Sequence, residues 1–180
     1  MSDFLFIGKD AVVFPLAKIV FPETVFIDDH AVVSDFCFIL GKKFVKIGKY
    51  SHLAPYAMIT GGGEVYIQDF VDISYAVKII SGTDDIFGDS LFTPSVPANL
   101  RKVKRSTVEI NNFAFIGANS LIYPGVKIGE GAIVNPGTIV RKNLDSWTVY
   151  DGQECLPVGK RKYREEIIRK AEQLVELRKK

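Results

Sequence analysis

Aliphatic residues recur at every sixth position through the second half of the chain, with small and polar residues between them. A helix repeats about every 3.6 residues and a strand about every two, so a period of six fits neither element. It suits a chain that turns three corners in each coil and builds a prism, with one aliphatic side chain pointing inward from each face. The uninterrupted run consists of Ile110, Ile116, Ile122, Ile128, Val134 and Val140.

The same period returns upstream in shorter runs, which span Ile7 to Val25, Ile27 to Ile39, Ile47 to Val65 and Ile67 to Ile79. Frame slips after Ile39 and after Val65 indicate small bulges or loops at corners. Roughly six or seven coils of about 18 residues account for residues 5–150, because no coil buries its inner face without neighbours. The pattern predicts a parallel β-helix over residues 1–150.

Residues 81–107 interrupt this pattern and contain no six-residue repeat. The segment is rich in turn formers and ends in a basic run, Arg101 to Arg105. A loop of this length without a pattern of its own is uncommon unless it is functional. We expect it to project from the prism.

Residues 151–180 form a C-terminal tail with a helical pattern. The positions at helical spacing are Tyr163, Ile167, Ala171, Leu174 and Arg178. The spacing predicts an amphipathic helix. We expect its apolar stripe to pack against the end of the β-helix or against a neighbouring subunit.

Composition narrows the classes of protein. The chain has 180 residues, 47% of them hydrophobic, and a formal net charge of +2, which fits one domain and gives no reason to propose a nucleic-acid partner. Cys37 and Cys155 have no metal-like or redox-like spacing, so a reducing, cytoplasmic setting is expected. No apolar run approaches the roughly 20 residues of a membrane span, and no signal peptide is expected.

The run VEINNFAFIGANSLIYPGVKIGEGAIVNPGTIVRKNL resembles the hexapeptide-repeat acyltransferases, and within them the maltose, galactoside and nucleotide-sugar acetyltransferases. The resemblance covers almost the whole chain. It implies an all-β, left-handed parallel β-helix, acetyl-coenzyme A as co-substrate, no metal, and a homotrimer with active sites between adjacent prisms. The left hand follows from the resemblance alone.

The resemblance also implies cofactor contacts near the last coils. The motifs IGANS and PGT point to Ala118, Gly137 and Thr138, where small residues allow the pantetheine arm to reach the backbone. The RKN step places Arg141 and Lys142 where they can meet the phosphates of coenzyme A. A solvated, charged end of the prism is the alternative interpretation of these basic residues.

The ending GQECLPVGKRK departs from the family's GxPAKxIR and keeps only Gly152. Lys160 and Arg161 therefore match the family's nucleotide contacts weakly.

Acyl transfer to a hydroxyl requires a general base, because a neutral hydroxyl attacks a thioester slowly. Many family members carry a histidine in the coil of the loop, but this chain has IISGTDDIFG there and only two histidines in all. His52 directly precedes the inward-pointing Leu53, so its side chain should face outward. We predict His52 as the catalytic base and His30 as an ordinary surface histidine.

The loop carries the carboxylates Asp84 and Asp85, with Asp89 nearby. Asp84 or Asp85 could orient His52 or bind the sugar, since carboxylates accept hydrogen bonds from hydroxyls and pair with ammonium groups. The alternative is a simple turn, which Asp and Gly also favour. The basic run that follows could meet a nucleotide diphosphate or remain solvated.

The leading hypothesis is an acetyl-coenzyme A-dependent acetyltransferase that modifies a sugar hydroxyl in polysaccharide or nucleotide-sugar biosynthesis. N-acetylation of a nucleotide-linked amino sugar is the competing hypothesis, because an amine needs less help from a base. A β-helix scaffold without catalysis is the third. A γ-type carbonic anhydrase is excluded, because it needs three zinc-binding histidines.

Overall fold

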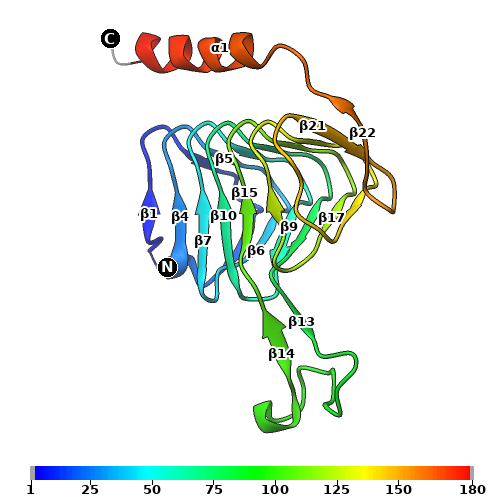
Figure 1. The fold of residues 1–180 in the computed structure, drawn as a ribbon. Coiled ribbons are helices and arrows are strands. Elements are labelled where there is room, and N and C mark those ends of the chain that lie inside the picture. The colour runs from blue at the N-terminus through cyan, green and yellow to red at the C-terminus, as the bar shows by residue number, and fades with distance from the viewer. Residues whose placement is uncertain (1–2, 179–180) are drawn as a thin grey trace.

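The chain is wound into a prism of stacked coils, from which one ribbon and one helix stand out (Figure 1). The computed structural model describes residues 3–178. Each coil adds short strands to three sheets, and within the coils each strand pairs in parallel with its counterpart in the next coil. The expected all-β, parallel β-helix is confirmed.

The strands fall into three long sheets. The first sheet contains β1 (Phe6–Ile7), β4 (Val25–Ile27), β7 (Phe44–Ile47), β10 (Glu64–Ile67), β15 (Val108–Ile110) and β18 (Lys127–Ile128). The second contains β2 (Val12–Val13), β5 (Val32–Val33), β8 (His52–Leu53), β11 (Asp72–Ile73), β16 (Phe115–Ile116), β19 (Ile133–Val134), β21 (Thr148–Asp151) and the antiparallel β22 (Leu156–Lys160). The third contains β3 (Lys18–Val20), β6 (Phe38–Leu40), β9 (Met58–Thr60), β12 (Lys78–Ile80), β17 (Leu121–Ile122) and β20 (Ile139–Val140).

Aliphatic side chains fill the interior in ladders. In the first sheet, Ile27 pairs with Ile47, Ile47 with Ile67, and the row continues to Ile110 and Ile128. All five are fully buried. Because burying one such side chain contributes about 1.5–3 kcal/mol, these rows are a major source of stability.

Coils in the first half of the chain are longer than the six-residue period predicts. Phe26 pairs with Lys46 and Lys46 with Tyr66, whereas the later pair, Glu109 with Lys127, is closer together along the chain and matches the predicted coil. The additional residues lie at the corner between the third and first sheets, which explains both frame slips. The uniform coil length predicted from the sequence is therefore wrong for the first half.

The projecting ribbon leaves the prism at this same corner. Strand β13 (Gly82–Asp84) pairs antiparallel with β14 (Val103–Arg105), and together they carry residues 85–102 away from the coils (Figure 1). A 3-10 helix, η2 (Ala98–Leu100), lies near the far end, and a second one, η1 (Pro22–Thr24), precedes β4. Because the ribbon is inserted between β12 and β15, the stacking of coils continues past it.

A column of stacked rings lies along the corner between the first and second sheets. We call it the aromatic column; it consists of His30, Tyr50, Phe70, Phe113 and Trp147. Successive ring centroids are 4.7, 5.0, 5.4 and 6.3 Å apart. Each of these residues has a positive φ, between 53 and 62°. Stacking of this kind is worth about 0.5–1.5 kcal/mol per pair, which helps to offset the backbone strain.

Helix α1 (Arg164–Leu177) runs along the stacked coils (Figure 1). Its apolar stripe borders, together with Phe70 and Phe113, a hollow of about 330 Å³. Beyond its last turn, Arg178 Nη1 donates to His30 Nδ1 at 2.9 Å. The expected amphipathic helix is thus present, but it lies along a corner and not at the end of the prism. No helix within residues 3–178 is long and apolar enough to cross a membrane.

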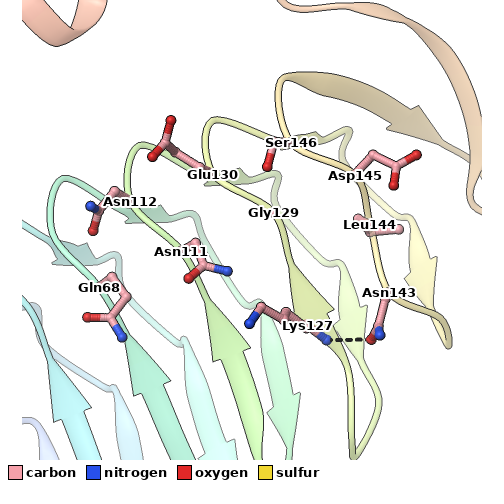
Figure 2. A pocket seen from close by; sticks show the side chains of 10 residues that line it. All are labelled: Gln68, Asn111, Asn112, Lys127, Gly129, Glu130, Asn143, Leu144, Asp145 and Ser146. Atoms are coloured by element: carbon pink, nitrogen blue, oxygen red, sulfur yellow. Dashed lines mark hydrogen bonds between the residues drawn. The ribbon is translucent and has the colours of Figure 1, made fainter.

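A polar hollow of about 470 Å³ lies on the first sheet near the last coils (Figure 2). Two of its amide side chains link successive coils, since Asp69 N–H donates to Asn112 Oδ1 at 3.0 Å and Lys127 N–H donates to Asn143 Oδ1 at 2.8 Å. We therefore regard the hollow as a consequence of these hydrogen bonds between coils. It is lined by Gln68, Asn111, Asn112, Lys127, Gly129, Glu130, Asn143, Leu144, Asp145 and Ser146.

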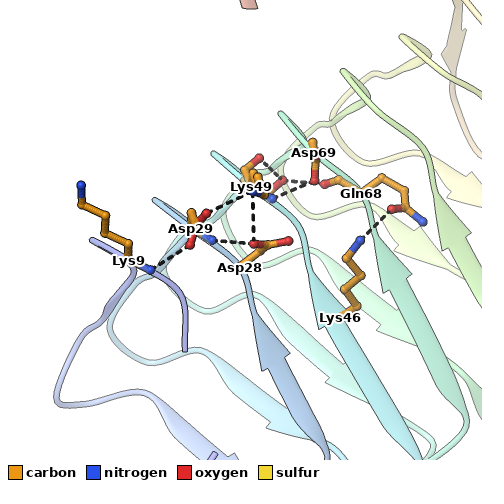
Figure 3. A network of polar contacts seen from close by, with 8 residues as sticks. Lys9, Asp28, Asp29, Lys46, Lys49, Gln68 and Asp69 are labelled. Atoms are coloured by element: carbon orange, nitrogen blue, oxygen red, sulfur yellow. Dashed lines mark hydrogen bonds and ion pairs between the residues drawn. The ribbon is translucent and has the colours of Figure 1, made fainter. Parts of the chain in front are cut away.

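In earlier coils, the corner between the first and second sheets carries a ladder of charged residues (Figure 3). Asp29 Oδ1 accepts the backbone N–H of Lys9, and Asp69 Oδ1 accepts that of Lys49, each at 2.9 Å. Lys49 Nζ also lies 3.1 Å from Asp29 Oδ2. The hydrogen bond from Lys49, and after it that from Lys9, holds the pKa of the Asp29 carboxyl below its usual value. The same bond to Asp29 raises the pKa of the Lys49 ammonium.

Gly131 occupies the position of the aromatic column between Phe113 and Trp147. A Cβ there would lie 2.5 Å from the Trp147 ring, and φ is +64°, whereas Gly137 has φ +74° and open space around its Cα. We expect Gly137→Ala to cost about 1 kcal/mol through strain alone and Gly131→Ala about 3 kcal/mol, because it also displaces Trp147. Urea unfolding at fixed protein concentration measures both. Equal losses would contradict the role of the Trp147 ring.

Asp29 should contribute to stability only while it is ionised. Since its folded pKa is lower than the usual 3.8, this contribution is present above that pH and is lost as the pH falls through the folded pKa. Between about pH 5 and pH 3 we expect Asp29→Asn to lose less unfolding free energy than the wild type. The matched control, Asp89→Asn in the projecting ribbon, should follow the wild type. Parallel curves for Asp29→Asn and wild type would show that the ladder carries no charge-dependent stability.

Candidate functional site

His52 lies at the centre of a polar row on the outward face of the second sheet. It starts β8 and pairs with Val32 of β5 on one side and Asp72 of β11 on the other. His52 Nδ1 is 2.9 Å from Asp72 Oδ1, and its Nε2 is 3.0 Å from Ser34 Oγ. The outward orientation predicted for His52 is therefore present, and the residue lies between two polar partners.

These two partners define the state of the imidazole. When the Asp72 carboxylate is ionised and the imidazole is neutral, Nδ1–H donates to the carboxylate and Nε2 accepts from the Ser34 hydroxyl. The His52 and Asp72 side chains are 42% and 47% exposed, so both remain accessible from solvent. A histidine held in this way can remove a proton from a group that takes the place of the Ser34 hydroxyl.

The sequence did not identify Asp72, although a signal was available. Asp72 follows His52 by one coil, at the longer spacing that this half of the chain uses throughout. With the predicted coil of about 18 residues, the position opposite His52 falls on Phe70 instead. A small error in the coil length thus concealed the partner of His52.

Asp84 and Asp85 do not contact His52, and the expectation that one of them orients it is wrong within a single chain. They leave the corner between the third and first sheets, opposite the sheet that carries His52. Asp84 Oδ1 accepts from Arg101 Nη2 at 3.1 Å. Lys104 Nζ lies 3.0 Å from Asp85 Oδ2, and this hydrogen bond lowers the pKa of the Asp85 carboxyl. The basic run of the ribbon thus pairs with Asp84 and Asp85.

The predicted cofactor residues separate into surface and interior positions. Gly137 is exposed, with nothing within 4 Å of the place of a Cβ, and its N–H donates to the carbonyl of Ala118 in the preceding coil at 2.8 Å. Thr138 is 0% exposed. Its N–H donates to Asn135 O and its carbonyl accepts from Leu121, so the expectation that Thr138 contacts a cofactor is wrong.

The predicted phosphate contacts are exposed at the corner that follows β20. The Arg141 guanidinium lies 5.0 Å from the centroid of the Tyr123 ring, and Lys142 is exposed beside it. The weaker candidates have structural partners, because Lys160 Nζ donates to Thr148 Oγ1 at 2.6 Å and Arg161 donates to the carbonyl of Phe113. Within residues 3–178, no group of three His, Cys, Asp or Glu side chains is placed to hold a metal ion.

Comparison with known proteins agrees with this architecture. The family model described as bacterial transferase hexapeptide (six repeats) matches residues 107–142. The chain is 31% identical over 140 residues to dTDP-4-amino-4,6-dideoxy-D-glucose acyltransferase of Escherichia coli, an alignment that covers 77% of this chain and 73% of the relative. It is 26% identical over 132 residues to the putative lipopolysaccharide biosynthesis O-acetyl transferase WbbJ of Escherichia coli K12, covering 71% of this chain and 63% of WbbJ.

Among solved structures, the chain is similar to AntD, an N-acyltransferase from Bacillus cereus in complex with dTDP and 3-hydroxybutyryl-CoA. The TM-score is 0.88 at 32% identity, with 97% of this chain and 92% of AntD covered. Identity and coverage of this extent establish the family of the chain. The chain belongs to the hexapeptide-repeat acyltransferases, in the branch that transfers acyl groups from coenzyme A to sugars.

Proposed function

We propose that the chain transfers an acyl group from acetyl-coenzyme A, or a related short acyl-coenzyme A, to the amine of a dTDP-linked amino sugar. The main support is the similarity over nearly the whole chain to AntD, which binds dTDP and an acyl-CoA. An acyltransferase named for a dTDP-linked 4-amino sugar is similar over 77% of the chain. Amine acylation was the competing hypothesis from the sequence. It now becomes the leading one.

His52 would serve this reaction as the proton acceptor. The amine nitrogen attacks the thioester carbonyl, the C–N bond forms, and the C–S bond breaks. His52 Nε2 takes a proton from the amine and returns it to the departing sulfur, while Asp72, 2.9 Å from Nδ1, stabilises the imidazolium. The acceptor would replace Ser34 as the group facing Nε2.

A hydroxyl acceptor is the second candidate, and the His52–Asp72 pair is the observation that favours it. A hydroxyl needs a base more than a neutral amine does. The similarity to WbbJ, named as an O-acetyl transferase, points in the same direction at lower identity.

We propose Asp84 and Asp85 as contacts of the acceptor sugar, with Asp84 the stronger candidate because it has a single ionic partner. AntD has been solved as variants of one serine and of one aspartate, ten residues apart in its sequence. In this chain a serine is followed ten residues later by an aspartate only at Ser74 and Asp84. The two lie at different corners of one prism, which favours a site shared between subunits.

The remaining parts of the proposal concern the assembly and the cofactor. We expect a homotrimer, in which a neighbouring prism supplies the second wall of each site, and a cytoplasmic setting. The acyl-CoA would lie along the bare corner at Ala118 and Gly137, with Arg141 and Lys142 near its phosphates. No metal is expected to take part.

The direct test mixes purified protein, acetyl-coenzyme A and dTDP-4-amino-4,6-dideoxyglucose and follows product mass. We expect N-acetylated nucleotide sugar from the wild type. For an amine acceptor, His52→Ala should reduce the rate by about tenfold near neutral pH, with recovery toward about pH 9, where solvent removes the proton instead. His30→Ala is the matched histidine control and should leave the rate unchanged.

Two outcomes would decide against this proposal. Acetylation of a hydroxyl, with a loss of about 10²–10⁴-fold in His52→Ala at every pH, would establish the second candidate. No acylated product from any amino or neutral nucleotide sugar would contradict both.

A further inference from the structure

Ser34, His52 and Asp72 form one hydrogen-bonded row across three successive coils. Ser34 Oγ is 3.0 Å from His52 Nε2, and His52 Nδ1 is 2.9 Å from Asp72 Oδ1. The order hydroxyl, imidazole, carboxylate is that of a catalytic triad, which is recognised by its geometry and not by its sequence order or fold. Direct acyl transfer to a sugar has no need of a hydroxyl on Nε2.

The hydrogen bond between Ser34 and His52 does not follow from the strand register alone. Asp72 stands directly opposite His52, but on the other side the residue opposite His52 is Val32, and Ser34 lies two positions further along the chain. The imidazole thus bridges diagonally to the serine while Asp72 holds its other nitrogen. The row also remains half-exposed, with 42% of the His52 side chain accessible, so a small reagent can reach it.

We propose that Ser34 is a nucleophile and that the row hydrolyses small acyl esters and thioesters. Ser34 Oγ attacks the acyl carbonyl and its proton passes to His52 Nε2, which gives it to the departing alkoxide or thiolate. Water then attacks the Ser34 ester and loses a proton to Nε2, and Oγ recovers that proton as the acid leaves. One ester and one water are consumed, and one acid and one alcohol or thiol are formed.

This activity shares His52 with the proposed function but requires neither coenzyme A nor a sugar. The row stands on the outward face of a sheet, so short acyl chains that need no deep pocket are the expected substrates. In the acyltransferase itself, Ser34 would compete with the acceptor for the acyl group.

The test is active-site labelling with a fluorophosphonate probe, which traps activated serines, followed by peptide mass mapping. We expect the label on Ser34 and none at that peptide in Ser34→Ala. Labelling should slow by about 10²-fold or more in His52→Ala, because the general base is gone. Ser146→Ala, which removes an exposed serine outside the row, should label like the wild type. The rate of p-nitrophenyl acetate hydrolysis should fall in Ser34→Ala and His52→Ala, as labelling does.

Asp72 acts through His52 and needs its own readout. In the ¹⁵N spectrum of the imidazole we expect the Nδ1–H tautomer in the wild type. In Asp72→Ala, where Nδ1 loses its acceptor, we expect a shift toward the Nε2–H form. A merely structural role for Asp72 would leave the tautomer unchanged. Circular dichroism establishes that each variant is folded.

An unlabelled Ser34 in the folded wild type would overturn the proposal, as would labelling of Ser34 at an equal rate in His52→Ala. Neither result would touch the acyltransferase, which is measured with different substrates. Conversely, labelling of Ser34 in a protein that acylates no nucleotide sugar would leave this inference standing alone.

Discussion

The register of one coil on the next is the constraint on which the structure depends. Rows such as Ile27, Ile47 and Ile67 stack in the interior, and a slip of one residue would turn every aliphatic side chain outward. Outward residues one coil apart are therefore fixed neighbours. The aromatic column, the Asp29–Lys49 ladder and the row of Ser34, His52 and Asp72 all follow from this one condition.

The same stacking decides where a ligand can approach the backbone. At the corner between the second and third sheets, early coils carry Phe36 and Tyr56, with ring centroids 5.1 Å apart, whereas later coils carry Asn119 and Gly137 at equivalent positions of positive φ. Bulky rings thus cover the corner at one end of the prism, and the other end is bare. The proposed acyl-CoA arm would lie along this bare end, with Arg141 and Lys142 at the next corner, after β20.

The hydrophobic period was sufficient to predict the β-helix, the buried aliphatic rows and the outward orientation of His52, because each depends on local alternation along the chain. It could not reveal Asp72, since that partner depends on a coil length that differs between the two halves of the chain. Thr138 was misplaced because a motif match does not distinguish inward from outward side chains. The aromatic column also escaped notice, since positive φ in non-glycine residues leaves no hydrophobic pattern. The position of α1 depends on that column and was missed with it.

The central claim is that the bare corner at Gly137 receives the acyl donor, and calorimetric titration with acetyl-coenzyme A tests it most directly. The account predicts binding with a Kd of about 1 μM to 1 mM for the wild type and for Gly137→Ala, whose methyl group leaves the corner open. It predicts no measurable binding to folded Gly137→Trp, whose ring would fill the corner. Equal binding to Gly137→Trp and wild type, or no binding to either, would contradict the account.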